Sequence, residues 1–388
     1  MSPTSYQLLY PAVYRLKRIT KVKVTFTKTN TFAGYLNAMD TTPQENETSP
    51  NKTQPTTSVG GAAQPATSVE DTAQPSTAQS DEIQSDEESS NPSHRAGFVS
   101  IVGKPNVGKS TLMNALVGER LSIITSKAQT TRHRIMGIVN GDDFQIVYSD
   151  TPGLVKPQYE LHQAMMRFVN VALEDADVIL FVTDLYEKYE ADPLGDDAYV
   201  QKLVNSDVPV VLVMNKIDLA KGSQALDKMT YWQEIVKPAE SIMVSALEGL
   251  NVGAVLDAIL QRLPEHPPYF DKDQITDKPE RFFAAEIVRE KIFMNYKQEV
   301  PYSSEVVVTE FKEDEQIIRM RCEIYVERAS QKGILIGKGG AGLKKVGIQA
   351  RADLEQFFGK QVHLEQHVKV VPNWRREHRK LQNFGYRS

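Results

Sequence analysis

Short apolar runs alternate with segments of helical periodicity between about residues 95 and 263. The runs are GFVSIV, FQIVYS, DVILFVTD, VPVVLVM and SIMVSA, and each has the length of a buried strand. Strands that alternate with helices are typical of a mostly parallel sheet with helices on both faces. The last helix of this α/β domain, 95–263, is expected in VGAVLDAILQRL, before prolines at positions 264, 267 and 268 that cannot continue it.

A different pattern follows a linker at 264–280. An amphipathic helix is expected in RFFAAEIVREKIF, and two strands in SSEVVVTEF and IIRMRCEIYVER, with KEDEQ as the hairpin between them. The segment ILIGKGGAGLKKVGIQARADLEQFF combines a short helix, a glycine loop and a cationic helix, and VHLEQHVKVV indicates a closing strand. The order α-β-β-α-α-β predicts an α+β domain over 281–371, with a C-terminal tail at 372–388.

The first 94 residues show neither periodicity. Residues 39–93 carry ten acidic side chains and one basic side chain among many Pro, Thr, Ser and Gln residues, so they cannot bury a core. Residues 1–38 carry six Lys or Arg residues and no acid. This basic stretch fits a transit peptide, a membrane-surface segment, or untranslated sequence upstream of a start at Met39. We predict a disordered extension over 1–94.

Charge separates the two predicted domains. Residues 94–280 carry 18 basic and 26 acidic side chains, a net charge of −8, whereas residues 281–388 carry 20 and 14, a net charge of +6. The second domain is therefore the one suited to a polyanion. Cys322 is the only cysteine, which excludes an intrachain disulfide and suits a reducing compartment. No apolar run reaches the ~18 residues of a spanning helix, so the protein is expected to be soluble or at most peripheral.

The stretch GKPNVGKS fits the pattern G-x-x-x-x-G-K-[ST] and lies between a predicted strand and a predicted helix. Its glycines let backbone N–H groups surround phosphate oxygens, Lys109 reaches the β- and γ-phosphates, and the Ser110 hydroxyl binds Mg²⁺. The alternative is an ordinary glycine turn. The predicted phosphate-binding residues are Gly103, Lys104, Pro105, Asn106, Val107, Gly108, Lys109, Ser110 and Thr111.

The stretch DTPG follows the strand-like run FQIVYS, at the strand end where open α/β sheets bind ligands. Asp150 can hold Mg²⁺, usually through water. Gly153 lacks a Cβ, so its N–H can approach a γ-phosphate and move when that phosphate leaves. Thr151, Pro152 and Leu154 complete this part of the predicted nucleotide site.

The stretch NKID follows the run VPVVLVM and predicts the base specificity. Asp218 can accept the N1–H and the 2-amino group of guanine, two donors that adenine lacks. A buried carboxylate left unpaired by the wrong base costs binding energy. Ser245 and Ala246, in VSAL, are expected to close the base pocket through a backbone N–H near the guanine carbonyl. With Asn215, Lys216 and Ile217, these residues complete a predicted pocket for Mg·GTP.

A glycine loop in the second domain predicts nucleic-acid binding. GKGG, at 337–340, is a GxxG loop, the element with which KH modules clamp the backbone of a single strand. The alternative is a glycine-rich helix entry with a solvated basic face. Trp374, among Arg375, Arg376, Arg379 and Lys380, either stacks on bases or packs onto the domain. The predicted RNA-binding residues are Gly337, Lys338, Gly339, Gly340, Lys344, Lys345 and Arg351.

The order of these motifs resembles the Era family of ribosome-assembly GTPases, in which a P-loop GTPase domain precedes a type II KH domain. The resemblance covers about residues 96–386 and rests on GKPNVGKSTLMNAL, SKAQTTRHRIMGIV, DTPG, ITD, VPYS and IGKGGAGLKKVGIQARADLE. Residues 1–93 fall outside it. Val155 stands where many members have His, a departure that we do not expect to change the chemistry.

The resemblance implies an enzyme that hydrolyses GTP to GDP and phosphate during maturation of the small ribosomal subunit. It implies that the KH domain binds the pyrimidine-rich 3′ end of the small-subunit (16S-type) rRNA. It also implies weak peripheral membrane association in bacteria; we expect a cytoplasmic monomer, or an organellar protein if 1–38 is a transit peptide. In the switch segment 126–134, it implies a Mg²⁺-binding threonine, first Thr131 and then Thr130.

Leu154 stands where many small GTPases place the glutamine that orients the attacking water. Intrinsic hydrolysis should therefore be slow and depend on electrostatics, including a contribution from outside. Asn106 with switch-loop carbonyls is a candidate K⁺ site, and the alternative is a residue that only shapes the loop. The competing function is a non-catalytic RNA-binding assembly factor with structural GTP. The predicted catalytic residues are Lys109, Ser110, Thr131, Asp150 and Gly153.

Overall fold

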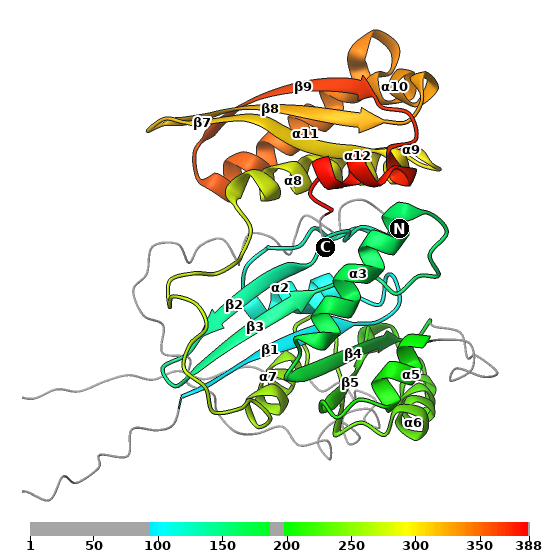
Figure 1. Ribbon diagram of the computed structural model, residues 1–388, viewed down its shortest axis with the longest axis vertical. Coiled ribbons are helices and arrows are strands. Elements are labelled where there is room, and N and C mark those ends of the chain that lie inside the picture. Colours follow the sequence, from blue (N-terminus) through cyan, green and yellow to red (C-terminus); the bar gives the residue numbers. More distant parts are fainter. Residues whose placement is uncertain (1–93, 187–197, 387–388) are drawn as a thin grey trace, which may run out of the picture. The chain divides into compact units, whose positions relative to one another are not determined.

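A computed structural model describes residues 94–186 and 198–386, and the expectations for residues 1–93 lie outside this part of the chain. The described residues form two sheets (Figure 1). The first has six strands in the order β2-β3-β1-β4-β5-β6, and the second has three in the order β7-β8-β9. The predicted division into an α/β domain and an α+β domain is thus matched by two sheets.

The first sheet is parallel except at one edge. Its predicted strands are β1 (Arg95–Val102), β3 (Phe144–Asp150), β4 (Val178–Asp184), β5 (Val210–Asn215) and β6 (Glu240–Met243). The edge strand β2 (Ile135–Asn140) pairs antiparallel with β3. The apolar runs did not include β2, because its sequence IMGIVN is interrupted by Gly137 and ends in a polar residue, Asn140. The predicted class, a mostly parallel sheet, is confirmed.

Helices cover both faces of this sheet (Figure 1). Strand β4 shows why its sequence is apolar throughout: Val178, Leu180 and Val182 face one core, whereas Ile179 and Phe181 face the other. The first core is completed by α2 (Lys109–Val117) and α7 (Val252–Leu260). The second is completed by α3 (Glu160–Glu174), α5 (Ala198–Val204) and α6 (Gln224–Val236).

The segment between the domains is attached to the edge strand β2. The Ile138 N–H donates to the Ile275 carbonyl at 2.9 Å, and the Thr276 hydroxyl donates to the Met136 carbonyl at 2.7 Å. These bonds occupy polar groups of an edge strand that would otherwise be open to pairing. The linker 264–280 therefore runs along the first domain before the second begins.

The second domain has the predicted element order. Strands β7 (Glu305–Glu313) and β8 (Ile317–Val326) are antiparallel, and β9 (Gln361–Val370) lies parallel to β8. The helices α8 (Glu280–Asn295) and α11 (Ala341–Phe358) cover one face of this sheet (Figure 1). The shorter helices are α9 (Val300–Ser303), α10 (Ala329–Ile336) and η4 (Lys338–Gly340). Cys322 is a packed strand residue, and burial raises the pKa of its thiol to about 12.

Helix α8 differs from the predicted amphipathic helix because its polar side is also buried. Arg289 donates to the Thr130 carbonyl at 2.5 Å, and Glu290 accepts from Arg120 at 2.5 Å. Lys291 pairs with Asp353 of α11 at 2.5 Å. The polar side of α8 is therefore a contact surface toward the first domain and α11, which periodicity alone cannot distinguish from a solvated face.

The C-terminal tail packs onto the protein through η5 (Trp374–Arg376) and α12 (His378–Asn383). The Trp374 side chain is fully buried, and its indole N–H donates to the Ser303 carbonyl at 2.9 Å. Of the two interpretations of Trp374, packing onto the domain is therefore correct and base stacking is wrong. Buried Tyr386 donates its hydroxyl to Glu305 at 2.7 Å.

His133 contributes a pH-dependent term to stability. Its ring stacks on Tyr386 with centroids 4.3 Å apart, and burial lowers the pKa of His133 to about 3, although Glu305 opposes that shift. Below the usual histidine pKa of about 6.5, the unfolded chain binds a proton that the folded chain does not. The free energy of unfolding should therefore fall as the pH drops below 6.5, by at most about 1.4 kcal/mol per pH unit.

Urea unfolding at pH 7.5 and 5.5 measures this dependence. The His133→Phe variant retains an aromatic ring that cannot be protonated, so its stability should fall less between these two pH values than that of the wild type. Equal losses in the two proteins would contradict the assignment.

Candidate nucleotide and nucleic-acid sites

The loop 103–108 connects β1 to α2 and requires glycine at both ends. Gly103 has φ 152° and Gly108 has φ 99°. A Cβ on Gly103 would lie 2.1 Å from the Val182 carbonyl oxygen, and one on Gly108 would lie 2.2 Å from Asn215 Nδ2. Only glycine fits these positions, which explains the glycines of the phosphate-binding pattern.

Lys109, the first residue of α2, contacts this loop through its side chain. Its buried ammonium group donates to the carbonyl oxygens of Gly103 and Lys104, both at 3.0 Å. The cation is therefore held at the start of α2, where the backbone N–H groups of a helix N-terminus also favour an anion. This arrangement fits the predicted contact with the β- and γ-phosphates.

Three oxygen-bearing side chains meet beside Lys109. Ser110 Oγ donates to Asp150 Oδ2 at 2.7 Å and lies 2.9 Å from Thr131 Oγ1, which is 3.4 Å from Asp150 Oδ2. Burial raises the pKa of Asp150, while Ser110 and Lys109 act in the opposite direction. Asp150 Oδ1 is buried and has no hydrogen-bond partner in the described part of the chain. This oxygen-rich cluster fits Mg²⁺, which prefers carboxylate and hydroxyl ligands.

The two candidate switch threonines differ in their contacts. Thr131 joins the cluster of Ser110 and Asp150. Thr130 instead donates its hydroxyl to the Lys127 carbonyl at 2.7 Å and lies 2.5 Å from Thr125 Oγ1. Geometry therefore favours Thr131 as the metal ligand and gives Thr130 a role within its own loop.

Asn215 connects three of the nucleotide motifs. Its Nδ2 donates to the Val107 carbonyl at 2.9 Å, and its Oδ1 accepts from the backbone N–H groups of Lys216 and Ala246 at 2.8 and 3.0 Å. The Ala246 N–H therefore has a partner within the protein, on the same side chain that contacts the phosphate loop. Ser245 is fully buried beside it, and its hydroxyl accepts from the Glu248 N–H.

Asp218 is exposed on the short helix η3 (Ile217–Leu219), although the sequence argument treated it as buried. A bound base would have to supply that desolvation. Lys216 donates to the Asn106 carbonyl and to Asp184, both at 2.6 Å. The bond to Asn106 connects the NKID motif to the phosphate loop. Sequence reasoning missed Asp184, which ends strand β4 as the other site residues end theirs.

Leu154 cannot orient water. Its side chain is buried in the second core, and its N–H donates to the Gly103 carbonyl at 3.1 Å. A Cβ on neighbouring Gly153 would lie 2.8 Å from the Pro105 Cα, so the DTPG turn passes close to the phosphate loop. Thr151 holds this turn by donating its hydroxyl to the Ile101 carbonyl at 2.7 Å.

Asn106, the candidate K⁺ residue, is exposed and contacts the switch segment. Its Nδ2 donates to the Ser126 carbonyl at 3.3 Å.

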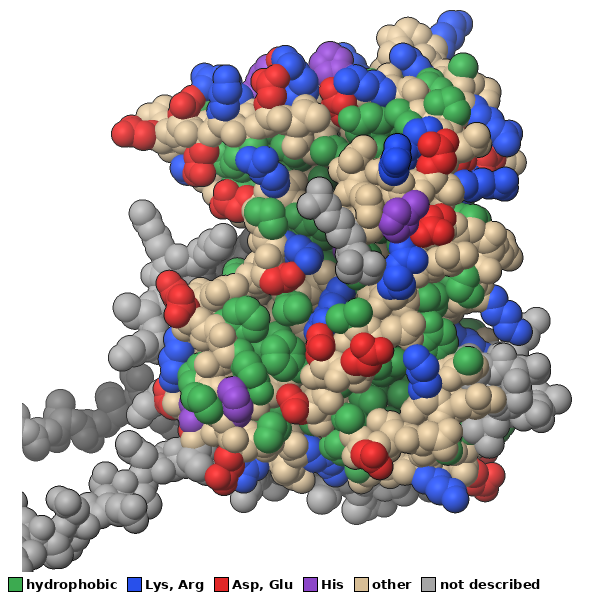
Figure 2. All heavy atoms as spheres, viewed as in Figure 1, with side chains coloured by type: hydrophobic (Ala, Val, Ile, Leu, Met, Phe, Trp, Pro, Cys, Tyr) green, Lys and Arg blue, Asp and Glu red, His purple; other side chains and the backbone are tan. Residues whose placement is uncertain are grey.

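The GxxG loop lies between α10 and α11. Gly337, Gly339 and Gly340 all have positive φ, and both middle residues of the loop, Lys338 and Gly339, are exposed. Lys and Arg side chains lie along the outer edge of this domain, with Asp, Glu and His side chains among them (Figure 2). Lys344, Lys345 and Arg351 are exposed on α11.

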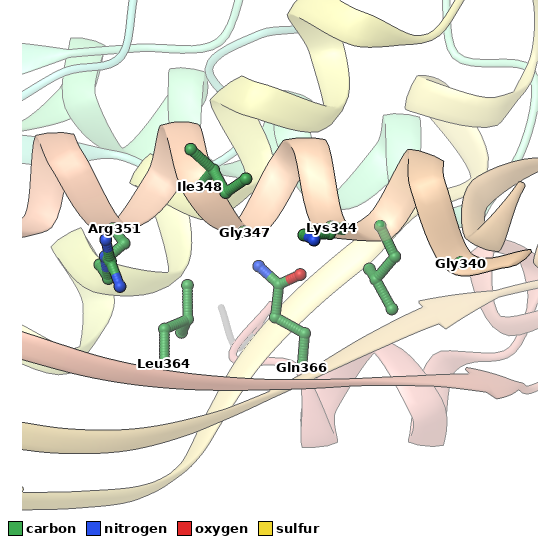
Figure 3. A pocket seen from close by; sticks show the side chains of 8 residues that line it. Gly340, Lys344, Gly347, Ile348, Arg351, Leu364 and Gln366 are labelled. Atoms are coloured by element: carbon green, nitrogen blue, oxygen red, sulfur yellow. The ribbon is translucent and has the colours of Figure 1, made fainter.

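A groove lies next to the GxxG loop, between α11 and β9 (Figure 3). Lys344 and Arg351 line it, whereas Lys345 does not. Sequence reasoning missed five other lining residues, which are Leu343, Gly347, Ile348, Leu364 and Gln366. The signal for Gly347 and Ile348 was their helical spacing from Lys344, at i+3 and i+4.

Two family models match separate parts of this chain. The family described as "50S ribosome-binding GTPase" matches residues 98–216, and the family described as "KH domain" matches residues 299–375. GTPase Era of Staphylococcus haemolyticus is 43% identical over 294 residues, which cover 76% of this chain and 97% of that protein. The chain belongs to the GTPase Era family. GTPase Era of Staphylococcus epidermidis is 44% identical over the same length and coverage.

Two solved Era structures match the fold. Era in complex with MgGDPNP and nucleotides 1506–1542 of 16S ribosomal RNA is 40% identical, with a TM-score of 0.70. A variant of Aquifex aeolicus Era bound to GDP and AlF₄⁻ is also 40% identical, with a TM-score of 0.71. Each match covers 76% of this chain and all of the other. Membership of the Era family confirms the predicted GTPase and excludes the non-catalytic alternative.

Proposed function

We propose that this Era-family GTPase binds the 16S-type rRNA of the small ribosomal subunit through its KH domain and acts in assembly of that subunit. The observation that carries the proposal is the position of the switch segment. Thr131 faces Ser110 and Asp150 in the nucleotide site, while the next residue, Arg132, is bound by backbone and side-chain groups of the KH domain. The Era relative with MgGDPNP and 16S rRNA supports both ligands.

The residues of the nucleotide site have distinct roles in this proposal. Ser110, Thr131 and Asp150 would hold Mg²⁺, which supplies positive charge next to the phosphates. Lys109 exchanges the carbonyl oxygens of Gly103 and Lys104 for phosphate oxygens. The Gly153 N–H approaches the γ-phosphate and moves when that phosphate leaves. Asp218 selects guanine. Residue 154 is a leucine whose side chain is turned into the core, so no side chain at that position orients the attacking water. Intrinsic hydrolysis is therefore slow.

GTP turnover in the presence of RNA tests this function. Turnover in K⁺ buffer should rise several-fold with an oligonucleotide that matches the 3′ end of small-subunit rRNA. Gly339→Asp should abolish that rise, because it places a carboxylate on the exposed loop where RNA phosphates bind. Gly339 has φ 59°, and no neighbouring atom lies within 4 Å of where a Cβ would stand, so the change introduces charge without a clash.

Gly359→Asp is the matched control. Gly359 lies at the other end of α11, is exposed, has φ 66°, and also has open space around a Cβ. Both variants therefore introduce the same side chain into the same backbone conformation. RNA stimulation that survives in Gly339→Asp, or that is lost equally in Gly359→Asp, would contradict binding through the GxxG loop.

We also propose a K⁺ site at Asn106, because its side chain lies beside the Ser126 carbonyl of the switch segment. A cation there would supply the positive charge that an arginine finger supplies in other GTPases. Turnover should be faster in KCl than in NaCl at equal ionic strength. Asn106→Gly retains access to φ 66° while removing the side chain, and it should equalise the two rates. Equal rates in the wild type would contradict the site.

Location and assembly state remain predictions of the family resemblance. We propose that the protein works as a cytoplasmic monomer on precursors of the small subunit, with weak peripheral membrane association. No helix of the described residues has the length and hydropathy to cross a membrane. The organellar alternative depends on residues 1–38, and mass spectrometry of the intact protein would show whether they are present.

A further inference from the structure

The side chain of Asn114 holds the backbone of a neighbouring loop. Its Oδ1 accepts from the N–H groups of Leu121 and Ser122 at 3.1 and 2.9 Å, and its Nδ2 donates to the Ser122 carbonyl at 2.8 Å. Leu121 is anchored as well, because its side chain is buried in the first core. The amide and the buried neighbour therefore fix the position of Ser122 relative to α2.

Asn114 lies four residues after Ser110, so the two side chains share one face of α2. Ser110 contacts Asp150 directly, with its Oγ 2.7 Å from Asp150 Oδ2. Asn114 contacts the loop that carries Ser122. The helix that follows the phosphate loop thus positions two serine side chains, one of its own and one on the neighbouring loop.

The Ser122 hydroxyl is buried without a partner. The residue is 1% exposed, and neither Ser122 Oγ nor Asp150 Oδ1 has a hydrogen-bond partner among the residues that the structure describes. Burial raises the pKa of Asp150, and Ser122 is among the groups that lower it, which places this hydroxyl near the carboxylate although no hydrogen bond of regular geometry joins them. A buried donor and a buried acceptor left unpaired are both destabilising, so a small rotation that joins them is favoured.

We propose that Ser122 is a positioning residue for the Mg²⁺ site. Its hydroxyl donates to Asp150 Oδ1 and fixes the plane of the carboxylate, while Asp150 Oδ2 remains bonded to Ser110. Asn114 acts through Ser122, whose backbone it holds. The inference rests on the proposed Mg²⁺ site and adds the two residues that orient its carboxylate. Removing a group that orients a metal-binding carboxylate typically lowers metal affinity roughly 10- to 100-fold.

The position of Ser122 along the chain separates its role from that of Thr131. Thr131 belongs to the switch segment 126–134, and in GTPases such a segment is ordered by the γ-phosphate and Mg²⁺ and released on hydrolysis. Ser122 precedes this segment, and its bonds to Asn114 do not involve it. Ser122 should therefore act on Mg²⁺ bound with GDP as well as with GTP, whereas Thr131 should act only with GTP.

Release of the fluorescent nucleotide mant-GDP tests the proposal without requiring turnover. The release rate from the full-length protein after addition of excess GDP is measured over a range of Mg²⁺ concentrations, and the concentration that gives half-maximal retention is compared between variants. Ser122→Ala should raise this concentration about tenfold or more. Asn114→Ala should raise it too, and the double variant should need no more Mg²⁺ than Ser122→Ala alone. Thr131→Val should leave it unchanged.

Two comparisons separate the hydroxyl from packing. Ser122→Thr and Ser122→Val have nearly the same shape, so only the valine variant should lose Mg²⁺ affinity, even if the added bulk lowers the stability of both. Ser100→Ala removes another buried hydroxyl of this domain, which donates to the Ala172 carbonyl of α3. It should lower the urea midpoint and leave the Mg²⁺ requirement unchanged.

An unchanged Mg²⁺ requirement in Ser122→Ala would overturn the proposal, as would a loss of affinity in Ser122→Thr equal to that in Ser122→Val. If the effects of Ser122→Ala and Asn114→Ala multiply in the double variant, the assignment of Asn114 as acting through Ser122 is wrong. Release of mant-GDP from the wild type that does not respond to Mg²⁺ would instead reject the proposed Mg²⁺ site itself.

Discussion

Replacing Arg132 with alanine is expected to lower the free energy of unfolding by about 3–5 kcal/mol. The Arg132 side chain is fully buried and donates to Glu305 at 2.8 Å. It also donates to three backbone carbonyls of the KH domain, at 2.8 to 3.2 Å: those of Ser304, Pro301 and Tyr302. Alanine would leave these carbonyls unpaired and remove the main cation beside a buried carboxylate.

The carboxylate itself shows how strongly the arginine acts. Burial tends to raise the pKa of Glu305, but Arg132 and Arg289 outweigh burial and keep that pKa below its usual value. Without Arg132, Glu305 keeps the Tyr386 hydroxyl and the more distant Arg289. The loss should therefore be large but not complete, and it should appear as a lower urea midpoint at neutral pH.

A surface arginine provides the control for this measurement. Arg167 pairs with Glu160 at 3.3 Å, and both side chains are partly exposed to water. Arg167→Ala should change the free energy of unfolding by no more than about 1 kcal/mol. A comparably small effect of Arg132→Ala would show that the buried network does not hold the two domains together.

The same contacts place the switch segment between the two sites. Lys127 donates to the Tyr296 carbonyl at 2.5 Å and also to the Phe293 carbonyl, at the end of α8. The Tyr296 hydroxyl in turn donates to the Leu335 carbonyl at 2.6 Å, two residues before the GxxG loop. A change in the switch on GTP hydrolysis would thus act on groups that support the RNA site. Such coupling must be reciprocal in binding free energy.

Both sites could be located from the sequence because their chemistry depends on short local patterns. The glycines at 103 and 108 and the Lys109–Ser110 pair lie within eight residues, and a strand and a helix flank them. The GxxG loop is equally local. Asp150 was recognised because it ends a strand, and strand ends meet at one edge of a parallel sheet.

The missed features depend on partners far away in the sequence. Arg132 and Glu305 are 173 residues apart, so no local pattern showed that either would be buried. Gln366 gains its position from Gly347 on another element. Asp218 is exposed here, because the shielding that the sequence argument assumed for it has to come from a bound base. Burial of polar groups is set by tertiary contacts and ligands, which periodicity does not contain.

Replacing Thr131 with valine is expected to lower kcat for GTP hydrolysis by about 10²-fold or more, because it removes an oxygen from the cluster that faces the phosphates. Valine has nearly the shape of threonine, so the fold should persist. Thr131 Oγ1 lies 2.9 Å from Ser110 Oγ and 3.4 Å from Asp150 Oδ2. The measurement is turnover at saturating GTP and Mg²⁺, together with the Mg²⁺ concentration needed for half-maximal activity, which should rise.

Thr130→Val makes the same change one residue earlier and discriminates between the two threonines. The Thr130 hydroxyl is hydrogen-bonded within its own loop, to the Lys127 carbonyl and to Thr125 Oγ1. Its replacement should cost about 1 kcal/mol of stability and leave the Mg²⁺ requirement unchanged. If Thr130→Val instead raises the Mg²⁺ requirement and Thr131→Val does not, then Thr130 is the ligand. The switch segment would then have to rotate on nucleotide binding, and Arg132, two residues on, could not keep its KH-domain partners through that rotation.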